Sequence, residues 1–287
     1  MDLFLSVLAS SLIFIIFKSF PAWKIDTLQA VIANYFVAFA CGIFLFHDHI
    51  PASDALEIGM PFALLCGVLF ISLFIIMGLS SQKNGVASTS IAVKMSMALS
   101  VILVMLFNHA LIGLSTILPL ILALIGVFLA SFTKTSTQDA STHLWMLGVL
   151  FLGSAGLDIV LYFSNSKWLP TGFHEGIFAA LGFLMAGIMG LGYFIFKRLR
   201  GEIHFDRRSW VAGIILGIPN FFSIYLLVKS YSTLPLAPQQ ILSLANVGVV
   251  IFAAILGVTL FKEKFTIQKT IGLIICLAAL AFSTGFG

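Results

Sequence analysis

Long apolar runs, each interrupted by charged residues or turn formers, follow one another along the whole chain. A membrane-spanning helix needs about 20 predominantly apolar residues, because the hydrocarbon core of a bilayer is about 30 Å thick and a helix rises about 1.5 Å per residue. Runs of this kind predict ten spans, at residues 2–18, 25–46, 58–80, 85–108, 112–132, 144–164, 174–196, 209–230, 236–261 and 267–285. The pattern therefore predicts an all-α integral membrane protein.

The composition leads to the same class. Of the 287 residues 60% are hydrophobic and only 9% are charged, whereas about 25% of the residues of a soluble domain are charged. Cys41, Cys66 and Cys276 are scattered through apolar stretches, and we interpret them as small buried hydrophobes. No phosphate-binding loop, dinucleotide fingerprint or nucleophile motif is present. The sequence thus predicts neither an enzyme nor a cofactor.

The basic residues predict the orientation of the chain in the membrane. Of the 15 Lys and Arg residues, twelve fall in odd-numbered loops and two in even-numbered loops, while Lys94 lies inside a span. Cytoplasmic loops retain Lys and Arg. We therefore expect a protein of a bacterial cytoplasmic (inner) membrane with both termini outside. This distribution accounts for the net charge of +4 without a nucleic-acid partner.

The polar run 133–143 divides the chain into two halves that look related. We expect a first repeat at 1–134, a cytoplasmic linker at 135–143 and a second repeat at 144–287. Each half holds five spans, an odd number, so the halves would have opposite orientations in the membrane. Inverted repeats of this kind are common in secondary transporters, whose substrate sites lie near mid-membrane where the repeats meet.

The second half also carries a recognisable sequence pattern. Ser-Tyr-Ser-Thr-Leu-Pro-Leu-Ala-Pro-Gln-Gln, at 230–240, precedes an apolar helix that ends in Gly-Val-Thr-Leu-Phe-Lys-Glu-Lys-Phe-Thr-Ile-Gln-Lys-Thr-Ile-Gly, at 257–272. The two stretches resemble the drug/metabolite transporter superfamily, in particular its ten-span EamA-like branch. The resemblance implies two five-helix repeats and a transport function. The first half departs from the pattern, with Asn108-His109 in place of the acidic joint, which indicates a divergent member.

Five polar side chains inside the predicted spans are candidate substrate contacts: Lys94, Asn34, Asn220, Asn246 and Ser96. An ionisable group in hydrocarbon costs about 2.5–3.5 kcal/mol even on insertion scales, so its presence needs a reason. Lys94 could be a cation for a carboxylate or phosphate of the substrate or an amine that carries a proton. It could also be a structural partner of backbone carbonyls or Asp158. The asparagines could line a polar pocket or join helices by hydrogen bonds.

Four further residues lie nearer the expected outer face, and we consider them for coupling or gating. Asp158 is either a titrating proton carrier, which would allow proton coupling, or a salt-bridge partner. His174 and Glu175 open the seventh span, with Glu175 as the candidate, and Gln239 and Gln240 begin the ninth. Glu175, Gln239 and Gln240 could line the outer mouth or satisfy the backbone groups of a first helical turn.

Two other patterns are interpreted as structural. His47-Asp48-His49 contains residue types that bind metals, but no further ligand lies nearby in the sequence, so we interpret it as a solvated turn. Gly213-x-x-x-Gly217 and the series Gly182, Ala186 and Gly190 are typical of close helix packing.

These observations predict a secondary active transporter of small polar metabolites. We expect an exporter or exchanger of amino-acid-like compounds that works by alternating access. Its expected partners are a small-molecule substrate and the lipid bilayer. The sequence is compatible with a monomer and with a homodimer. The alternatives are a lipid-carrier flippase, a nucleotide-sugar transporter and, outside transport, a membrane-embedded enzyme or a scaffold.

Overall fold

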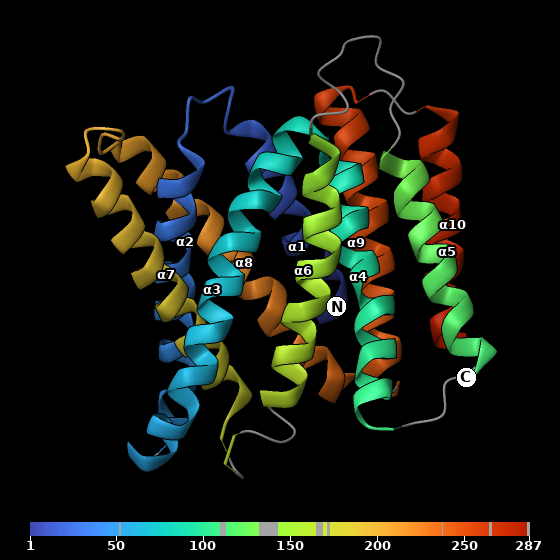
Figure 1. Cartoon of the computed structure of the whole chain (residues 1–287), viewed down its shortest axis with the longest axis horizontal. Helices are drawn as coiled ribbons and strands as arrows, with labels where there is room; N and C mark the ends of the chain where they lie inside the picture. Colours follow the sequence, from blue (N-terminus) through green and yellow to red (C-terminus); the bar gives the residue numbers. More distant parts are fainter. Residues whose placement is uncertain are drawn as a thin grey trace. The chain divides into compact units, whose positions relative to one another are not determined.

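The structure is a computed structural model that describes residues 1–51, 53–109, 113–131, 143–164, 169–170, 173–236, 238–263 and 266–285. This part of the chain forms ten α-helices and one short 3-10 helix, and it contains no strand. The elements, shown in Figure 1, are α1 (Asp2–Ser19), α2 (Thr27–Phe46), η1 (His47–His49), α3 (Ser53–Lys83), α4 (Val86–Phe107), α5 (Leu114–Ser131), α6 (Leu144–Phe163), α7 (Glu175–Leu199), α8 (Arg207–Thr233), α9 (Pro238–Phe261) and α10 (Ile267–Gly285). The predicted all-helical architecture is confirmed.

Most of these helices are long and apolar enough to cross a membrane. Eight meet this criterion in the described residues, and α5 and α10 carry shorter apolar stretches at Ile117–Leu129 and Ile267–Ala279. The chain is therefore a multi-pass membrane protein. With 31 residues, α3 is the longest helix. Its length of roughly 46 Å exceeds the hydrocarbon thickness, so it tilts or extends beyond the core.

Polar residues just ahead of several helices set where they begin. Asp26 accepts a hydrogen bond from the backbone N–H of Gln29 at 2.9 Å and so caps α2. Asp206 accepts from the N–H groups of Arg208 and Ser209, each at 3.2 Å, ahead of α8. These side chains satisfy backbone donors that have no partner within the helix.

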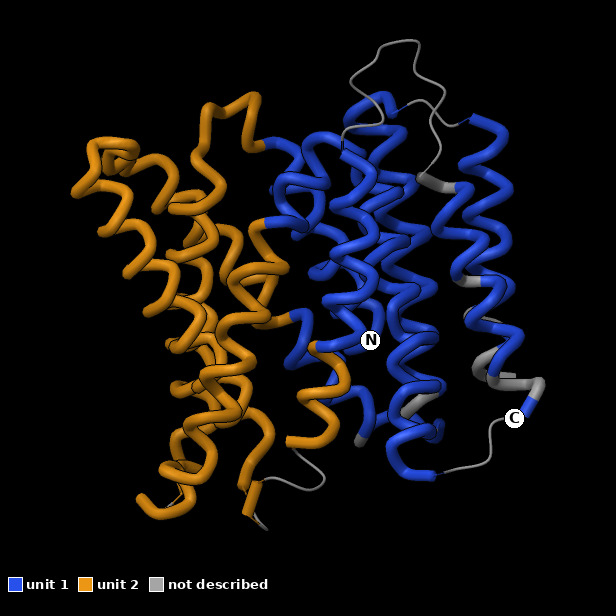
Figure 2. The backbone as a smooth tube through the Cα atoms, in the orientation of Figure 1, with its two compact units in different colours: residues 1–19, 76–156, 223–287 blue, residues 20–75, 157–222 orange. Residues whose placement is uncertain are grey.

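The helices form two compact units, coloured separately in Figure 2. Unit 1 comprises residues 1–19, 76–156 and 223–287, and unit 2 comprises residues 20–75 and 157–222. Each unit draws helices from both halves of the chain. The units are thus not the sequence halves 1–134 and 144–287, and the division into repeats stays a prediction.

Unit 1 is built from α1, α4, α5, α9 and α10 with the adjoining parts of α3, α6 and α8. Within it α5 packs on α10, and α4 and α1 both pack on α9. Its core includes buried side chains of α4, α6, α9 and α10, namely Ile91, Met95, Phe151, Val250, Cys276 and Ala279.

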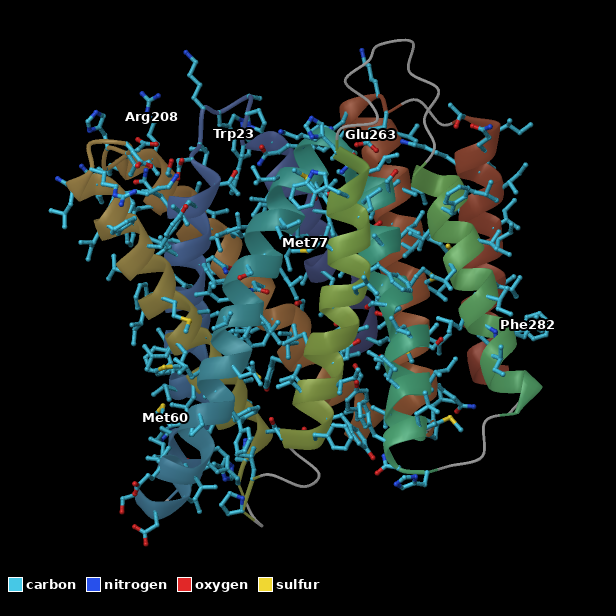
Figure 3. The ribbon with its side chains drawn as sticks, in the orientation of Figure 1. Trp23, Met60, Met77, Arg208, Glu263 and Phe282 are labelled. Carbon is cyan, nitrogen blue, oxygen red and sulfur yellow. The ribbon has the colours of Figure 1, made fainter. Side chains whose placement is uncertain are left out.

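Unit 2 is built from α2, α7 and parts of α3, α6 and α8, with α2 packed along α7. Figure 3 shows Trp23 and Arg208 at one end of this unit and Met60 toward the other. The predicted packing glycines are confirmed. A Cβ at Gly217 would lie 2.7 Å from the Cβ of Val37 on α2, and a Cβ at Gly190 would lie 2.7 Å from Cγ1 of Ile32. Only residues without a side chain permit this approach.

Candidate functional site

The residues predicted to contact substrate or control access are divided between the two units. Those in unit 1 are Lys94, Ser96, Asn246, Gln239 and Gln240. Those in unit 2 are Asn34, Asn220, Asp158 and Glu175.

In unit 1 the packing of α4 on α9 brings part of the predicted set together. Asn246 on α9 is only 5% exposed. Its Nδ2 donates a hydrogen bond to Sδ of Met97 on α4 at 3.2 Å. Met97 follows Ser96 and is three residues beyond Lys94. The structure thus places Asn246 beside the stretch of α4 that carries the predicted cation.

Lys94 lies well inside α4, roughly 12 Å along the helix axis from Val86. It is half-buried, whereas Met95 and Ser96 are buried. Oγ of Ser96 donates to the carbonyl of Val93 at 2.7 Å. Its proton is therefore used within the helix, and its oxygen keeps the capacity to accept. An otherwise apolar stretch of helix thus carries a cation and a hydroxyl two residues apart.

In unit 2 the most unusual of the predicted residues is Asn34 on α2. Its side chain is fully buried, and neither amide atom has a hydrogen-bond partner among the described residues. Buried amides that lack partners are rare, because the lost hydration is not replaced. The helix beside it is α8, since a Cβ at Gly217 would lie 2.9 Å from the backbone oxygen of Asn34. Asn220, 5% exposed, is three residues further along α8.

The four residues considered for coupling or gating have different surroundings. Asp158 is half-buried on α6, and Glu175 is exposed in the first turn of α7. Gln240 is half-buried in the first turn of α9. Gln239 lies in the same turn, and its side chain is outside the described residues.

Sequence reasoning missed the role of His174 at the start of α7. Its Nδ1 accepts a hydrogen bond from the N–H of Gly176 at 3.1 Å, so His174 caps α7. The ring also stacks on His49 of η1, with centroids 4.4 Å apart and planes 9° from parallel. Partial burial, and then the neighbouring His49, lower the pKa of His174, while Glu175 acts in the opposite direction. The position of His174 as the first residue of the seventh predicted span, 174–196, was the available signal.

The His47-Asp48-His49 segment forms the exposed 3-10 turn η1. Nε2 of His47 lies 3.2 Å from Oδ1 of Asp48. Across the described ranges, no group of three or more His, Cys, Asp or Glu side chains is arranged to hold a metal ion.

Comparison with known proteins matches the second half of the chain to a transporter family. Residues 146–285 match the model of the EamA-like transporter family. An uncharacterized protein of Haemophilus influenzae is 27% identical over 290 residues, which cover 97% of this chain and 96% of the relative.

The fold is also found among solved structures. One protein known from its crystal structure aligns over 97% of both chains with a TM-score of 0.59 and 11% identity. At that identity the likeness concerns the fold alone. The resemblance predicted from the residues at 230–240 and 257–272 is confirmed by the match of residues 146–285 to the model of the EamA-like transporter family.

Proposed function

We propose that this protein is a secondary active transporter, an exporter or exchanger, of small polar metabolites with an amino-acid-like character. The EamA-like domain indicates a membrane transporter of small solutes. The observation that supports a binding site is the position of Lys94, Ser96 and Asn246, polar groups that α4 and α9 carry inside an apolar unit.

Lys94 is the proposed contact for an anionic substrate group. A carboxylate or phosphate that reaches this half-buried ammonium gains an electrostatic contact in surroundings of low polarity. Ser96 and Asn246 supply hydrogen-bonding groups from the same pair of packed helices. Asn34 and Asn220 remain candidate substrate contacts on unit 2, and Asp158 remains the candidate for proton coupling.

We further propose that the two halves are inverted repeats. Helices of the same rank in the two halves pack against each other, α5 with α10 and α4 with α9 in unit 1, and α2 with α7 in unit 2. Counterpart helices meet in this way when a two-fold axis relates the halves. The Lys and Arg distribution supports a cytoplasmic location for the α7–α8 loop and outer locations for both termini.

A ligand screen on the purified protein tests the proposed site. A ligand that binds only the folded state stabilises the protein and so raises its thermal midpoint. At a free ligand concentration of a hundred times the dissociation constant, the stabilisation is about 2.7 kcal/mol. We expect a carboxylate- or phosphate-bearing metabolite to raise the midpoint of the wild type and of Lys197→Ala, a matched control at the end of α7. The same metabolite should not change the thermal midpoint of Lys94→Ala.

Two results would contradict the proposal. An equal ligand-induced shift in Lys94→Ala would remove Lys94 from the binding site. A wild-type protein that no anionic or amino-acid-like metabolite stabilises would contradict the substrate class.

A further inference from the structure

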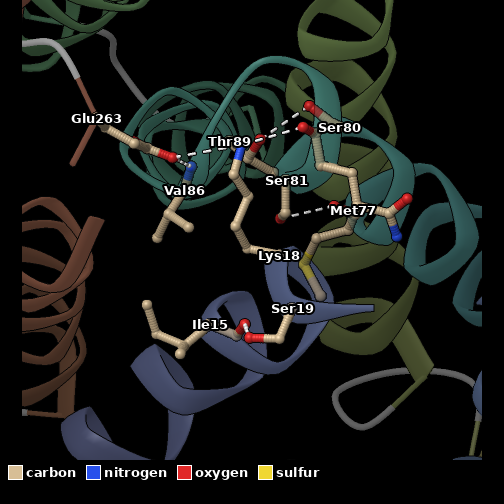
Figure 4. Close-up of polar contacts among 10 residues, drawn as sticks. Ile15, Lys18, Ser19, Met77, Ser80, Ser81, Val86, Thr89 and Glu263 are labelled. Carbon is tan, nitrogen blue, oxygen red and sulfur yellow. Dashed lines mark hydrogen bonds and ion pairs between the residues drawn. The ribbon is translucent and has the colours of Figure 1, made fainter. Parts of the chain in front are cut away.

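A buried carboxylate lies at one end of unit 1, in the joint between α9 and α10. The side chain of Glu263 is only 8% exposed. Its Oε1 accepts a hydrogen bond from the backbone N–H of Val86, the first residue of α4, at 2.8 Å. Nζ of Lys18, from the last turn of α1, lies 3.7 Å from the same oxygen. Figure 4 shows these contacts, and Figure 3 places Glu263 at the end of its unit.

The surroundings of this carboxylate are positively charged. Lys18 also donates to the carbonyl of Gln82 at 3.0 Å, which fixes its ammonium in place. Lys269 on α10 is only 7% exposed and interacts electrostatically with both Glu263 and Lys18. The N-terminus of the 22-residue helix α4 adds a partial positive charge. Two ammonium groups and a helix terminus therefore share one described carboxylate.

Two glycines leave the space that the carboxylate occupies. A Cβ at Gly85 would lie 2.9 Å from both carboxylate oxygens, and a Cβ at Gly257 would lie 2.9 Å from Oε2. Gly85 has a φ of +93°, which other residues rarely adopt. The joint folds back on α9 through a hydrogen bond from the N–H of Glu263 to the carbonyl of Gly257, 3.1 Å long. The positive φ of Gly85 and the lack of a side chain at Gly85 and Gly257 therefore allow the carboxylate of Glu263 to lie against the start of α4.

The second carboxylate oxygen has a different environment from the first. Oε2 is buried and has no hydrogen-bond partner among the described residues. The cap of α4 uses Oε1 alone, so the surroundings hold space for a second anionic oxygen that the cap does not need. This space and the excess of positive charge are what a site for a small oxyanion offers.

We propose that Lys18, Lys269 and the first turn of α4 form an anion-binding site whose resident anion is the carboxylate of Glu263. The carboxylate of Glu263, bound in this site, holds together the end of α1, the start of α4 and the α9–α10 joint. Removal of the carboxylate empties the site, which then takes a free carboxylate or a small inorganic oxyanion. The joint after α4 has no counterpart carboxylate at the equivalent place, since Asn108 and His109 stand there and are exposed.

The test is the thermal midpoint of Glu263→Ala, measured in detergent with sulfate and with chloride at equal ionic strength. Ala removes the carboxylate and leaves the space that a small oxyanion needs. Because loss of one partner leaves the other charges buried and unpaired, we expect a midpoint at least about 5 °C below that of the wild type in chloride. Sulfate should recover most of this loss and leave the wild type unchanged.

Two controls separate this site from general effects of salt and charge. Glu202→Gln breaks the exposed pair with Lys197, whose Nζ is 3.6 Å from Oε2 of Glu202, and should show neither loss nor sulfate response. Lys18→Gln removes a cation of the site, so its midpoint should fall without recovery in sulfate.

Several outcomes would overturn the proposal. They are an unchanged midpoint in Glu263→Ala, a loss in that variant that sulfate does not recover, and an equal response of the wild type to sulfate. If Glu263→Ala does not fold in chloride, recovery of its fold in sulfate supports the site. An unchanged midpoint in Lys18→Gln contradicts it.

Discussion

At the scale of single residues, polar side chains inside apolar helices cost free energy unless they find partners. Asn246 shows one such partner, because its Nδ2 donates to Sδ of Met97 at 3.2 Å and so joins α9 to α4. His174 shows another, because its ring caps the start of α7.

His174 provides a residue-level prediction about pH. The cap needs an unprotonated Nδ1, because a protonated nitrogen cannot accept from the N–H of Gly176. The pKa of His174 is lowered in the folded state, first by burial and then by His49. The neutral ring therefore contributes stability that is fully present above the unfolded pKa of about 6.5 and is lost as pH falls toward the lower folded pKa.

We expect His174→Asn to weaken this pH dependence, because Asn caps helices without titrating. His174→Ala should lose the cap at every pH, at a cost of about 1 kcal/mol. Thermal midpoints at pH 7.5 and pH 5 measure both effects. The other titratable groups nearby, Glu175 on α7 and His47, Asp48 and His49 on η1, are unchanged in these variants, so the difference from wild type isolates His174. An Asn variant as sensitive to acid as the wild type would contradict this role.

The sequence made some of these residues predictable and left their partners unknown. Polar groups cost free energy in hydrocarbon, so Lys94, Asn34 and Asn246 stand out by residue type and by depth in their spans. The contact of Asn246 with Met97 could not be predicted, because it joins residues 149 positions apart and depends on how α4 packs on α9.

At the scale of helices, the apolar pattern predicted how many there are and roughly where they lie, but not how far they extend. The run at 58–80 belongs to a helix over Ser53–Lys83, and the run at 209–230 to one over Arg207–Thr233. Apolar residues mark the part of a helix suited to hydrocarbon, whereas the helix itself continues into polar residues. Oγ of Ser81 donates to the carbonyl of Met77 at 2.8 Å, so a polar side chain is satisfied within the last turns.

The contact between α2 and α8 supplies a prediction for helix packing. A Cβ at Gly217 would lie 2.7 Å from the Cβ of Val37 and 2.9 Å from the backbone oxygen of Asn34. We expect Gly217→Ala to destabilise the protein by about 1–3 kcal/mol, because the helices must separate. Gly192→Ala is the matched control, since a Cβ there meets nothing within 4 Å. It should be neutral, or stabilising by up to about 1 kcal/mol.

Denaturation in detergent, followed for both alanine variants and the wild type, gives the comparison. Equal stability of Gly217→Ala and Gly192→Ala would mean that the close approach of α2 and α8 is not needed.

At the scale of the whole molecule, the compact units follow from long-range packing that no local pattern reports. The polar run at 133–143 predicts a division into halves, yet α2 packs on α7 and α5 on α10 across that division. Span count and loop charge are local properties and could be predicted, as could the family from residues 230–240 and 257–272. The pairs of helices that pack together could not be predicted, because their contact surfaces come from residues far apart in the sequence. Only the structure shows these pairs.

Transport of an anionic, amino-acid-like metabolite through a site that contains Lys94 can be measured as flux in proteoliposomes, for a panel of such metabolites with and without an ion gradient. We expect transport by the wild type and by Lys197→Ala, and loss of transport in Lys94→Ala. Lys94→Arg should transport poorly, because a planar guanidinium replaces a compact ammonium. Wild-type flux in Lys94→Ala, or the absence of flux for every metabolite of the panel, would contradict the proposed function.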